Sequence, residues 1–170
     1  MDSYYKYIRY LAYTIEILVF YVIEGIPNIF PDIKGVRPIL LILVAIMISL
    51  FEGKKVGTVF GLIVGLFLDY GASGDIGFYS VVITCVSFLV GVIAQKMIKF
   101  NLITSILIAI SFTTIVYMAH FMVKYLLCGY SDIIYSMLNH YLIGILYTSL
   151  FSPFIYFFNK AFAVNIQEKE

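Results

Sequence analysis

The chain has 170 residues, of which 62% are hydrophobic and 12% are charged, and its mean hydropathy is +1.01. Soluble domains carry about 25% charged residues, so this composition excludes an ordinary soluble protein and indicates an integral membrane protein. The formal net charge is only +1, and no run of lysines and arginines forms a basic patch. We therefore expect a lipid bilayer, and no nucleic acid, as the surroundings of this protein.

Six apolar segments follow one another along the chain. They predict one all-helical domain, residues 1–170, with about six membrane-spanning helices in one bundle. The predicted spans are residues 8–26, 38–51, 56–68, 78–94, 102–127 and 137–158. The second and third spans are shorter than the ~20 residues that a straight span needs, so a re-entrant hairpin is the alternative for this pair. Pro153 predicts a kink in the last segment.

The positions of the positive charges predict how the bundle is oriented in the membrane. If the amino terminus lies inside, eight of the 11 lysines and arginines fall on inner segments. The other three, Lys34, Arg37 and Lys124, fall on outer segments. This excess satisfies the positive-inside rule and predicts that both termini are cytoplasmic.

Four glycines, Gly53, Gly57, Gly61 and Gly65, recur at every fourth position in the third segment. This spacing places them on one face of a helix. In lipid, a face of small residues allows another helix backbone to come close. The pattern thus predicts close helix packing, with a partner helix either in this chain or in another protein. A polar, glycine-rich break at residues 69–77 follows, and we expect it at the outer membrane surface.

Glu16 lies near the centre of the first predicted span, where a carboxylate is costly and marks a candidate functional site. The alternative is a protonated or hydrogen-bonded side chain that faces the bundle interior. A second set of polar residues is expected at one level near the outer surface. This set comprises Glu24, Asp69, His120, Lys124, Asn139 and His140. It predicts either an outer polar pocket or a network that fixes loops to helices.

Catalytic and metal-binding signatures are weak in this sequence. The two histidines and the carboxylates show no known metal-ligand spacing, so we expect no metal and no cofactor. The tetrapeptide Gly71-Ala-Ser-Gly74 is similar to the nucleophile segment of intramembrane serine proteases, but it lies in an expected turn, where such residues are common. We expect no enzymatic activity. The alternative is a membrane enzyme in which Glu16 or His140 acts as the acid–base group.

One stretch resembles a known family. The run Gly57-Thr-Val-Phe-Gly-Leu-Ile-Val-Gly-Leu-Phe-Leu-Asp69, a turn through Ser73-Gly74 and the following Gly77-Phe-Tyr-Ser are similar to MreD, the small rod shape-determining membrane protein of bacteria. A later Gly91 and a last span with a proline also resemble that family. The signature residues expected from this resemblance are Gly57, Gly61, Gly65, Asp69, Gly74, Gly77, Gly91 and Pro153.

The resemblance implies a non-enzymatic, multi-pass scaffold in the bacterial cytoplasmic (inner) membrane. Its partners would be the single-span protein MreC, the filament protein MreB, RodA and a class-B penicillin-binding protein. The scaffold would couple MreC and MreB to lateral peptidoglycan synthesis in the cell-elongation complex. The alternative is the substrate-binding S component of an energy-coupling factor uptake transporter, a class of similar length. Such proteins typically carry A-x-x-x-A on the first helix, whereas here Ala12 is followed by Glu16.

Overall fold

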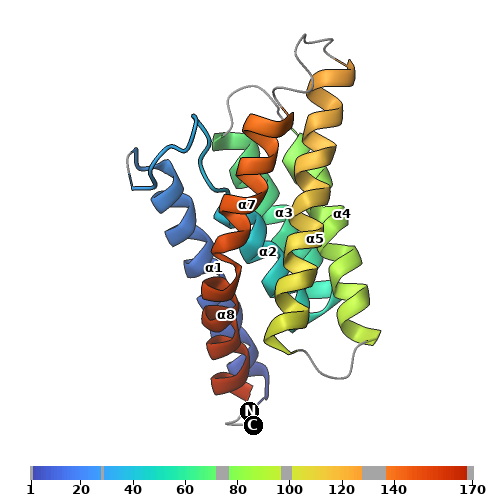
Figure 1. The fold of residues 1–170 in the computed structure, drawn as a ribbon. Helices are drawn as coiled ribbons and strands as arrows, with labels where there is room; N and C mark the ends of the chain where they lie inside the picture. The colour runs from blue at the N-terminus through green and yellow to red at the C-terminus, as the bar shows by residue number, and fades with distance from the viewer. Residues whose placement is uncertain (1, 28, 72–76, 97–100, 128–136, 168–170) are drawn as a thin grey trace.

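The computed structural model describes residues 2–27, 29–71, 77–96, 101–127 and 137–167 (Figure 1). Its elements are α1 (Asp2–Gly25), α2 (Leu40–Glu52), α3 (Lys54–Gly71), α4 (Phe78–Lys96), α5 (Leu102–Phe121), η1 (Met122–Leu127), η2 (Met137–Tyr141), α7 (Leu142–Leu150) and α8 (Ser152–Gln167). Within the described residues every element is a helix, apart from one isolated bridge between Ile33 and Val36. The prediction of an all-helical architecture is confirmed.

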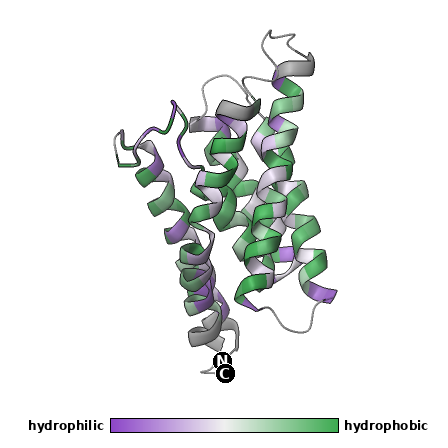
Figure 2. Cartoon of the chain, in the orientation of Figure 1, coloured by the Kyte–Doolittle hydropathy of each residue, from purple (hydrophilic) through white to green (hydrophobic). Residues whose placement is uncertain are grey.

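The helix α2 lies at the centre of the bundle. It contacts α1, α3, α4, α5, α7 and α8, and every residue from Leu40 to Leu50 is at most 3% exposed. Its sequence, LLILVAIMISLFE, is apolar on all sides, which is typical of a helix that is buried all round. Figure 2 shows that hydrophobic residues also dominate the middle of the surrounding helices.

The junction between α2 and α3 is a single residue, Gly53, so this glycine does not lie on the helix face of Gly57, Gly61 and Gly65 where it was expected. Its φ of +78° lies in the left-handed region that favours glycine, and its N–H donates to the carbonyl of Ser49 at 3.1 Å. The chain therefore reverses direction without a loop, and α3 returns along α2 towards α4. This hairpin explains why the predicted second and third spans are so close in sequence.

Only some of the helices meet the length and apolarity of a membrane span. Among the described residues, α4 and the continuous stretch Leu102–Lys124 do so. The pair α7 and α8 meets the same test when taken together, with a bend of 42° between them. The six-span count therefore remains a prediction, and so does the cytoplasmic location of both termini.

Two predicted segments differ in detail from the observed helices. The segment 102–127 is α-helical to Phe121 and then widens into the π-helical turn η1. The segment 137–158 is not one helix, because it starts as η2, breaks at Phe151 and continues to Gln167. The physical reason for the break is Pro153, which lacks the N–H that would bind the carbonyl of Ser149.

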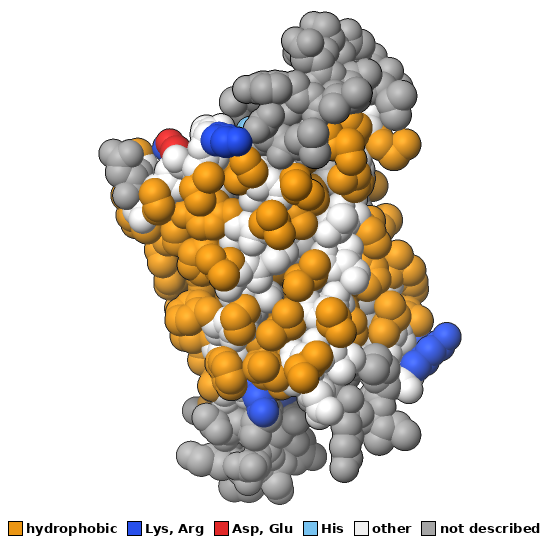
Figure 3. Space-filling model, viewed as in Figure 1, with side chains coloured by type: hydrophobic (Ala, Val, Ile, Leu, Met, Phe, Trp, Pro, Cys, Tyr) orange, Lys and Arg blue, Asp and Glu red, His pale blue; other side chains and the backbone are white. Residues whose placement is uncertain are grey.

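The surface of the bundle fits a lipid environment. Figure 3 shows hydrophobic side chains over the middle of one face, with charged side chains near its two ends. Figure 1 shows that α1 begins and α8 ends at the same end of the bundle, which we call the lower end. The loop 29–39, the end of α5 and the start of α7 lie at the opposite, upper end.

Candidate functional site: a cavity at the upper end of the bundle

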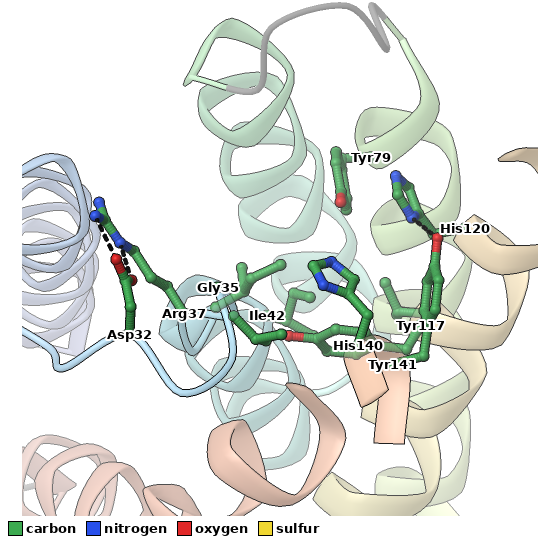
Figure 4. A pocket seen from close by; sticks show the side chains of 12 residues that line it. Asp32, Gly35, Arg37, Ile42, Tyr79, Tyr117, His120, His140 and Tyr141 are labelled. Atoms are coloured by element: carbon green, nitrogen blue, oxygen red, sulfur yellow. Dashed lines mark hydrogen bonds and ion pairs between the residues drawn. The ribbon is translucent and has the colours of Figure 1, made fainter. Parts of the chain in front are cut away.

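A hollow lies at the upper end, where the loop 29–39 meets α4, α5 and η2 (Figure 4). Its volume is 660 Å³. Its lining residues are Asp32, Gly35, Val36, Arg37, Ile39, Ile42, Tyr79, Val116, Tyr117, His120, His140 and Tyr141. We call this space the upper cavity. It combines apolar and aromatic walls with a few polar groups, as small-molecule and peptide-anchoring pockets do.

The rim of the upper cavity is a tight turn in the loop. The turn is closed by the bridge between Ile33 and Val36, whose N–H groups bind each other's carbonyls at 3.2 and 3.0 Å. Arg37 Nε donates to Asp32 Oδ1 at 2.6 Å, and its second nitrogen donates to Oδ2 at 3.2 Å. The hydrogen bond and charge of Arg37 hold the pKa of Asp32 below its usual range. Both side chains are exposed, so this ion pair shapes the rim more than it stabilises the fold.

The wall opposite the rim is aromatic. The hydroxyl of Tyr141 is 3.0 Å from Nδ1 of His120, and the ring of Tyr79 stacks on His120 with centroids 5.6 Å apart. Deeper in the wall, the hydroxyl of Tyr117 lies 3.0 Å from Oγ1 of Thr148, which also accepts the N–H of Ile39 at 3.2 Å. These bonds connect α4, α5, α7 and the start of α2. The aromatic rings are thus fixed in position before any partner binds.

Two of the polar residues expected at the outer surface bind helix N-termini. The carboxylate of Asp69 accepts the N–H groups of Tyr79 and Ser80 at 2.9 Å each, and it also accepts the hydroxyl of Ser80. Glu24 Oε1 accepts the N–H of Leu41 at 2.8 Å. The first turn of a helix has unpaired N–H groups and a partial positive charge, so carboxylates stabilise it. Asp69 therefore fastens α4 to α3, and Glu24 fastens α2 to α1.

Two of the other members of that predicted set, His120 and His140, lie at the upper cavity. They line it from α5 and η2 respectively. Lys124 lies in η1, one turn beyond His120. The side chain of Asn139 lies outside the described residues. The structure thus brings the two histidines together in one cavity, while Glu24 lines a neighbouring groove of 360 Å³ between α1 and α3.

The glycines of α3 lie where helices approach closely. A Cβ on Gly57 would lie 2.6 Å from the Cα of Ser49 in α2, and one on Gly65 would lie 2.5 Å from the Cα of Ser80 in α4. Gly61 faces the side chain of Ser87, and Gly91 of α4 faces the backbone of Lys54. The helices that they approach therefore belong to this chain. Gly74 lies outside the described residues, and Gly77, with a φ of +91°, directly precedes α4.

Glu16 lies inside the bundle, away from the upper cavity. It is 2% exposed, and its Oε1 accepts Nδ2 of Asn159 at 2.7 Å. Sequence analysis missed Asn159 because the last predicted span stops at residue 158, one position before it. The available signal was an amide side chain directly after an apolar segment, since such side chains form hydrogen bonds between membrane helices.

A second buried pair, near the lower end, was also missed. Arg9 Nε lies 2.9 Å from Glu52 Oε1, and the hydroxyl of Tyr13 donates to the same oxygen at 3.0 Å. Both charged side chains are at most 7% exposed. The sequence did contain a signal for this pair, because Arg9 and Glu52 carry opposite charges and lie at the same predicted membrane level. Together with Glu16 and Glu24, this pair attaches α1 to its neighbours at three depths.

The sequence of the chain matches a known protein family. The model of the family described as rod shape-determining protein MreD matches residues 5–162, which is nearly the whole chain. The chain belongs to the MreD family. Membership supports a role in rod shape determination and fits a membrane protein with apolar helices. Neither the curated proteins nor the solved structures contain a match to this MreD-family chain.

The groups that line the upper cavity are suited to binding a segment or a small molecule. No group of three or more His, Cys, Asp or Glu side chains that could hold a metal occurs among the described residues. Glu16, one candidate acid–base group, does not line the upper cavity, whereas His140, the other, does. The cavity can therefore offer aromatic, imidazole and guanidinium contacts to a segment or small molecule that enters from the upper end.

Proposed function

We propose that this protein is a non-enzymatic scaffold of the cell-elongation complex in the bacterial cytoplasmic (inner) membrane. In this proposal it couples MreC and MreB to lateral peptidoglycan synthesis by RodA and a class-B penicillin-binding protein. Six spans in one domain, with both termini in the cytoplasm, complete the proposal and would place the upper cavity on the outer surface. Family membership supports the cellular role, and the upper cavity supports docking of a partner.

The observation that carries the proposal is the pre-formed aromatic wall of the upper cavity. Tyr117, His120 and Tyr141 form hydrogen bonds to neighbouring helices, and Tyr79 stacks on His120, so a bound segment would not have to order these rings. Binding without such an ordering cost leaves more of the contact energy as affinity. Tyr and Arg are also the side chains that most often dominate protein interfaces. We infer that a juxtamembrane segment of the single-span partner inserts here.

The glycines of α3 have a different role in this proposal. Because they approach Ser49, Ser80 and Ser87 of the same chain, that face is not offered to a partner. We propose that it makes the bundle rigid, so that the upper cavity keeps its shape. The exposed hydrophobic faces of the outer helices then remain for lipid or for a partner's membrane span.

The test is co-purification of MreC in mild detergent with a variant that narrows the cavity. His140 is exposed and lines the cavity, so His140→Trp fills space without disturbing the core. The matched control is Leu146→Trp, at a position of α7 that is 63% exposed. We expect His140→Trp to reduce MreC recovery and Leu146→Trp to leave it unchanged. Equal recovery with both variants would refute docking in the cavity.

A second candidate function rests on the size of the same cavity. Its 660 Å³ lies within the range of about 300–1,000 Å³ that is typical of small-molecule pockets. This favours the alternative of a substrate-binding S component. Recovery of an ATPase pair and a coupling subunit, in place of MreC, would support that alternative. A ligand that raises the unfolding temperature would do the same, since binding to the folded state stabilises it.

A further inference from the structure

Glu16 and Asn159 form a polar pair in the interior of the bundle. Asn159 is fully buried and Glu16 is 2% exposed. Nδ2 of Asn159 donates to Glu16 Oε1 at 2.7 Å and to the carbonyl of Ile155 at 3.1 Å. The pair joins α1 to α8, two helices at opposite ends of the sequence.

The orientation of the Asn159 amide follows from these two contacts. Both neighbours of Nδ2 are oxygens, and the carbonyl of Ile155 can only accept a hydrogen bond. A flipped amide would direct Oδ1 at that carbonyl, and two acceptors cannot form a hydrogen bond. The amide nitrogen therefore faces Oε1 of Glu16 and the carbonyl of Ile155, and Oδ1 needs a donor from elsewhere.

Two oxygens of the pair have no hydrogen-bond partner among the residues that the structure describes. They are Oε2 of Glu16 and Oδ1 of Asn159, and both are sealed from solvent. If Glu16 is ionised, both atoms are acceptors and neither can satisfy the other. A buried acceptor without a donor is costly, and an unpaired carboxylate in the membrane interior is costlier still. A hydrogen on Oε2 of Glu16 could donate to Oδ1 of Asn159, so that both oxygens would take part in a hydrogen bond.

We propose that Glu16 and Asn159 form a proton-binding site within the bundle. The ligand is a single proton on Oε2 of Glu16, which donates a hydrogen bond to Oδ1 of Asn159. The result is a cyclic acid–amide pair in which Nδ2 donates to Oε1 and Oε2–H donates to Oδ1. Every polar atom of the two side chains then has a partner, and the contact between α1 and α8 carries no charge.

Glu52 provides the contrast, since it meets a cation. It lies on α2 near the lower end, and the guanidinium of Arg9 binds both of its oxygens. The hydroxyl of Tyr13 adds a third bond. Glu52 is therefore satisfied as an anion, whereas Glu16 is satisfied only as an acid. The same substitution, glutamate to glutamine, should have opposite consequences at the two positions.

The first experiment measures the unfolding temperature of the full chain in detergent at pH 7. Glutamine reproduces both hydrogen bonds of a protonated Glu16, so Glu16→Gln should shift the unfolding temperature by less than about 2 °C. Glu16→Leu, which leaves Asn159 unpaired, should lower it by about 4–8 °C. The matched control Glu52→Gln strands the Arg9 guanidinium and should lower it by about 8 °C or more.

The second experiment detects the proton directly. The infrared carbonyl band of a protonated carboxyl group should be present at pH 7 in the wild type and should be lost in Glu16→Gln. Absence of that band in the folded wild type would overturn the proposal. So would a Glu16→Gln variant as unstable as Glu52→Gln, or an unfolding temperature that rises with sodium in the wild type but not in Glu16→Gln. The last result would show that a metal cation occupies the site.

Discussion

Replacing Gly61 by alanine tests the close approach of α3 and α4. The added Cβ would lie 2.5 Å from the Cβ of Ser87 and 3.3 Å from the carbonyl oxygen of Ile83. Carbon atoms pack best at about 3.5–4.0 Å, so Ser87 must retreat by roughly 1 Å, and α4 with it. Such overpacking costs about 1–3 kcal/mol, which corresponds to a fall of about 2–12 °C in the unfolding temperature.

The atoms closest to the new methyl group belong to the side chain of Ser87, so a second substitution should reverse the loss of stability. The double variant Gly61→Ala/Ser87→Gly lacks this side chain and should recover most of the lost stability. We expect a favourable coupling of about 1–2 kcal/mol in a double-mutant cycle, measured by thermal unfolding in detergent. Gly65→Ala should not be rescued by Ser80→Gly, because its Cβ meets backbone atoms of Tyr79 and Ser80.

The control is another glycine-to-alanine change in a helix of the same bundle. Within the described part of the chain, no neighbouring atom lies within 4 Å of a Cβ built on Gly25, so Gly25→Ala should leave the unfolding temperature nearly unchanged. If Gly61→Ala is as stable as Gly25→Ala, the helices are not in the close contact described here. If the double variant fails to recover stability, Ser87 is not the group that limits the approach.

Three further predictions concern the charged groups. Asp69→Ala removes the cap of α4 and should lower stability by about 1–2 kcal/mol, which thermal unfolding will show; no loss would contradict the capping role. Arg9→Met leaves Glu52 without its cation and should cost about 3–5 kcal/mol, whereas replacing both partners by apolar residues should restore much of this, as denaturation of the two variants and the wild type can establish. The pKa of Asp32 is lowered by Arg37, so the ion pair at the rim should persist below the usual pKa of an aspartate and be lost as pH falls through the lowered value. Carboxyl NMR would follow this titration, and an unshifted Asp32 would exclude the pair.

The sequence predicted an all-helical architecture because apolar segments follow one another along the chain, and every element among the described residues is a helix. It also placed the glycines of α3 on one face, since a spacing of four residues has only one geometric meaning in a helix. It left open which helix they approach. That depends on the reversal at Gly53, where one residue with a positive φ sends α3 back beside α2 and α4.

The polar contacts were harder to predict because their partners are remote in sequence. Glu16 and Asn159 are 143 positions apart, and Arg9 and Glu52 are 43 apart. Hydrophobic periodicity describes one helix at a time, so it cannot predict which polar side chains of different helices contact each other. Asp69 was singled out, but its contact with the start of α4 depends on how the chain returns after residue 71. The upper cavity likewise joins the loop 29–39 to η2, which no local pattern connects.

The shortness of α2 has a consequence for how the protein is made. Thirteen residues at ~1.5 Å each give a helix about 20 Å long, roughly two-thirds of a ~30 Å hydrocarbon core. If α2 lies in the bilayer as proposed, it is too short to cross the hydrocarbon core by itself. Because Gly53 joins it directly to α3, we expect the two helices to enter the bilayer together as one hairpin. Insertion of the central helix and its burial by its neighbours would then occur in one step.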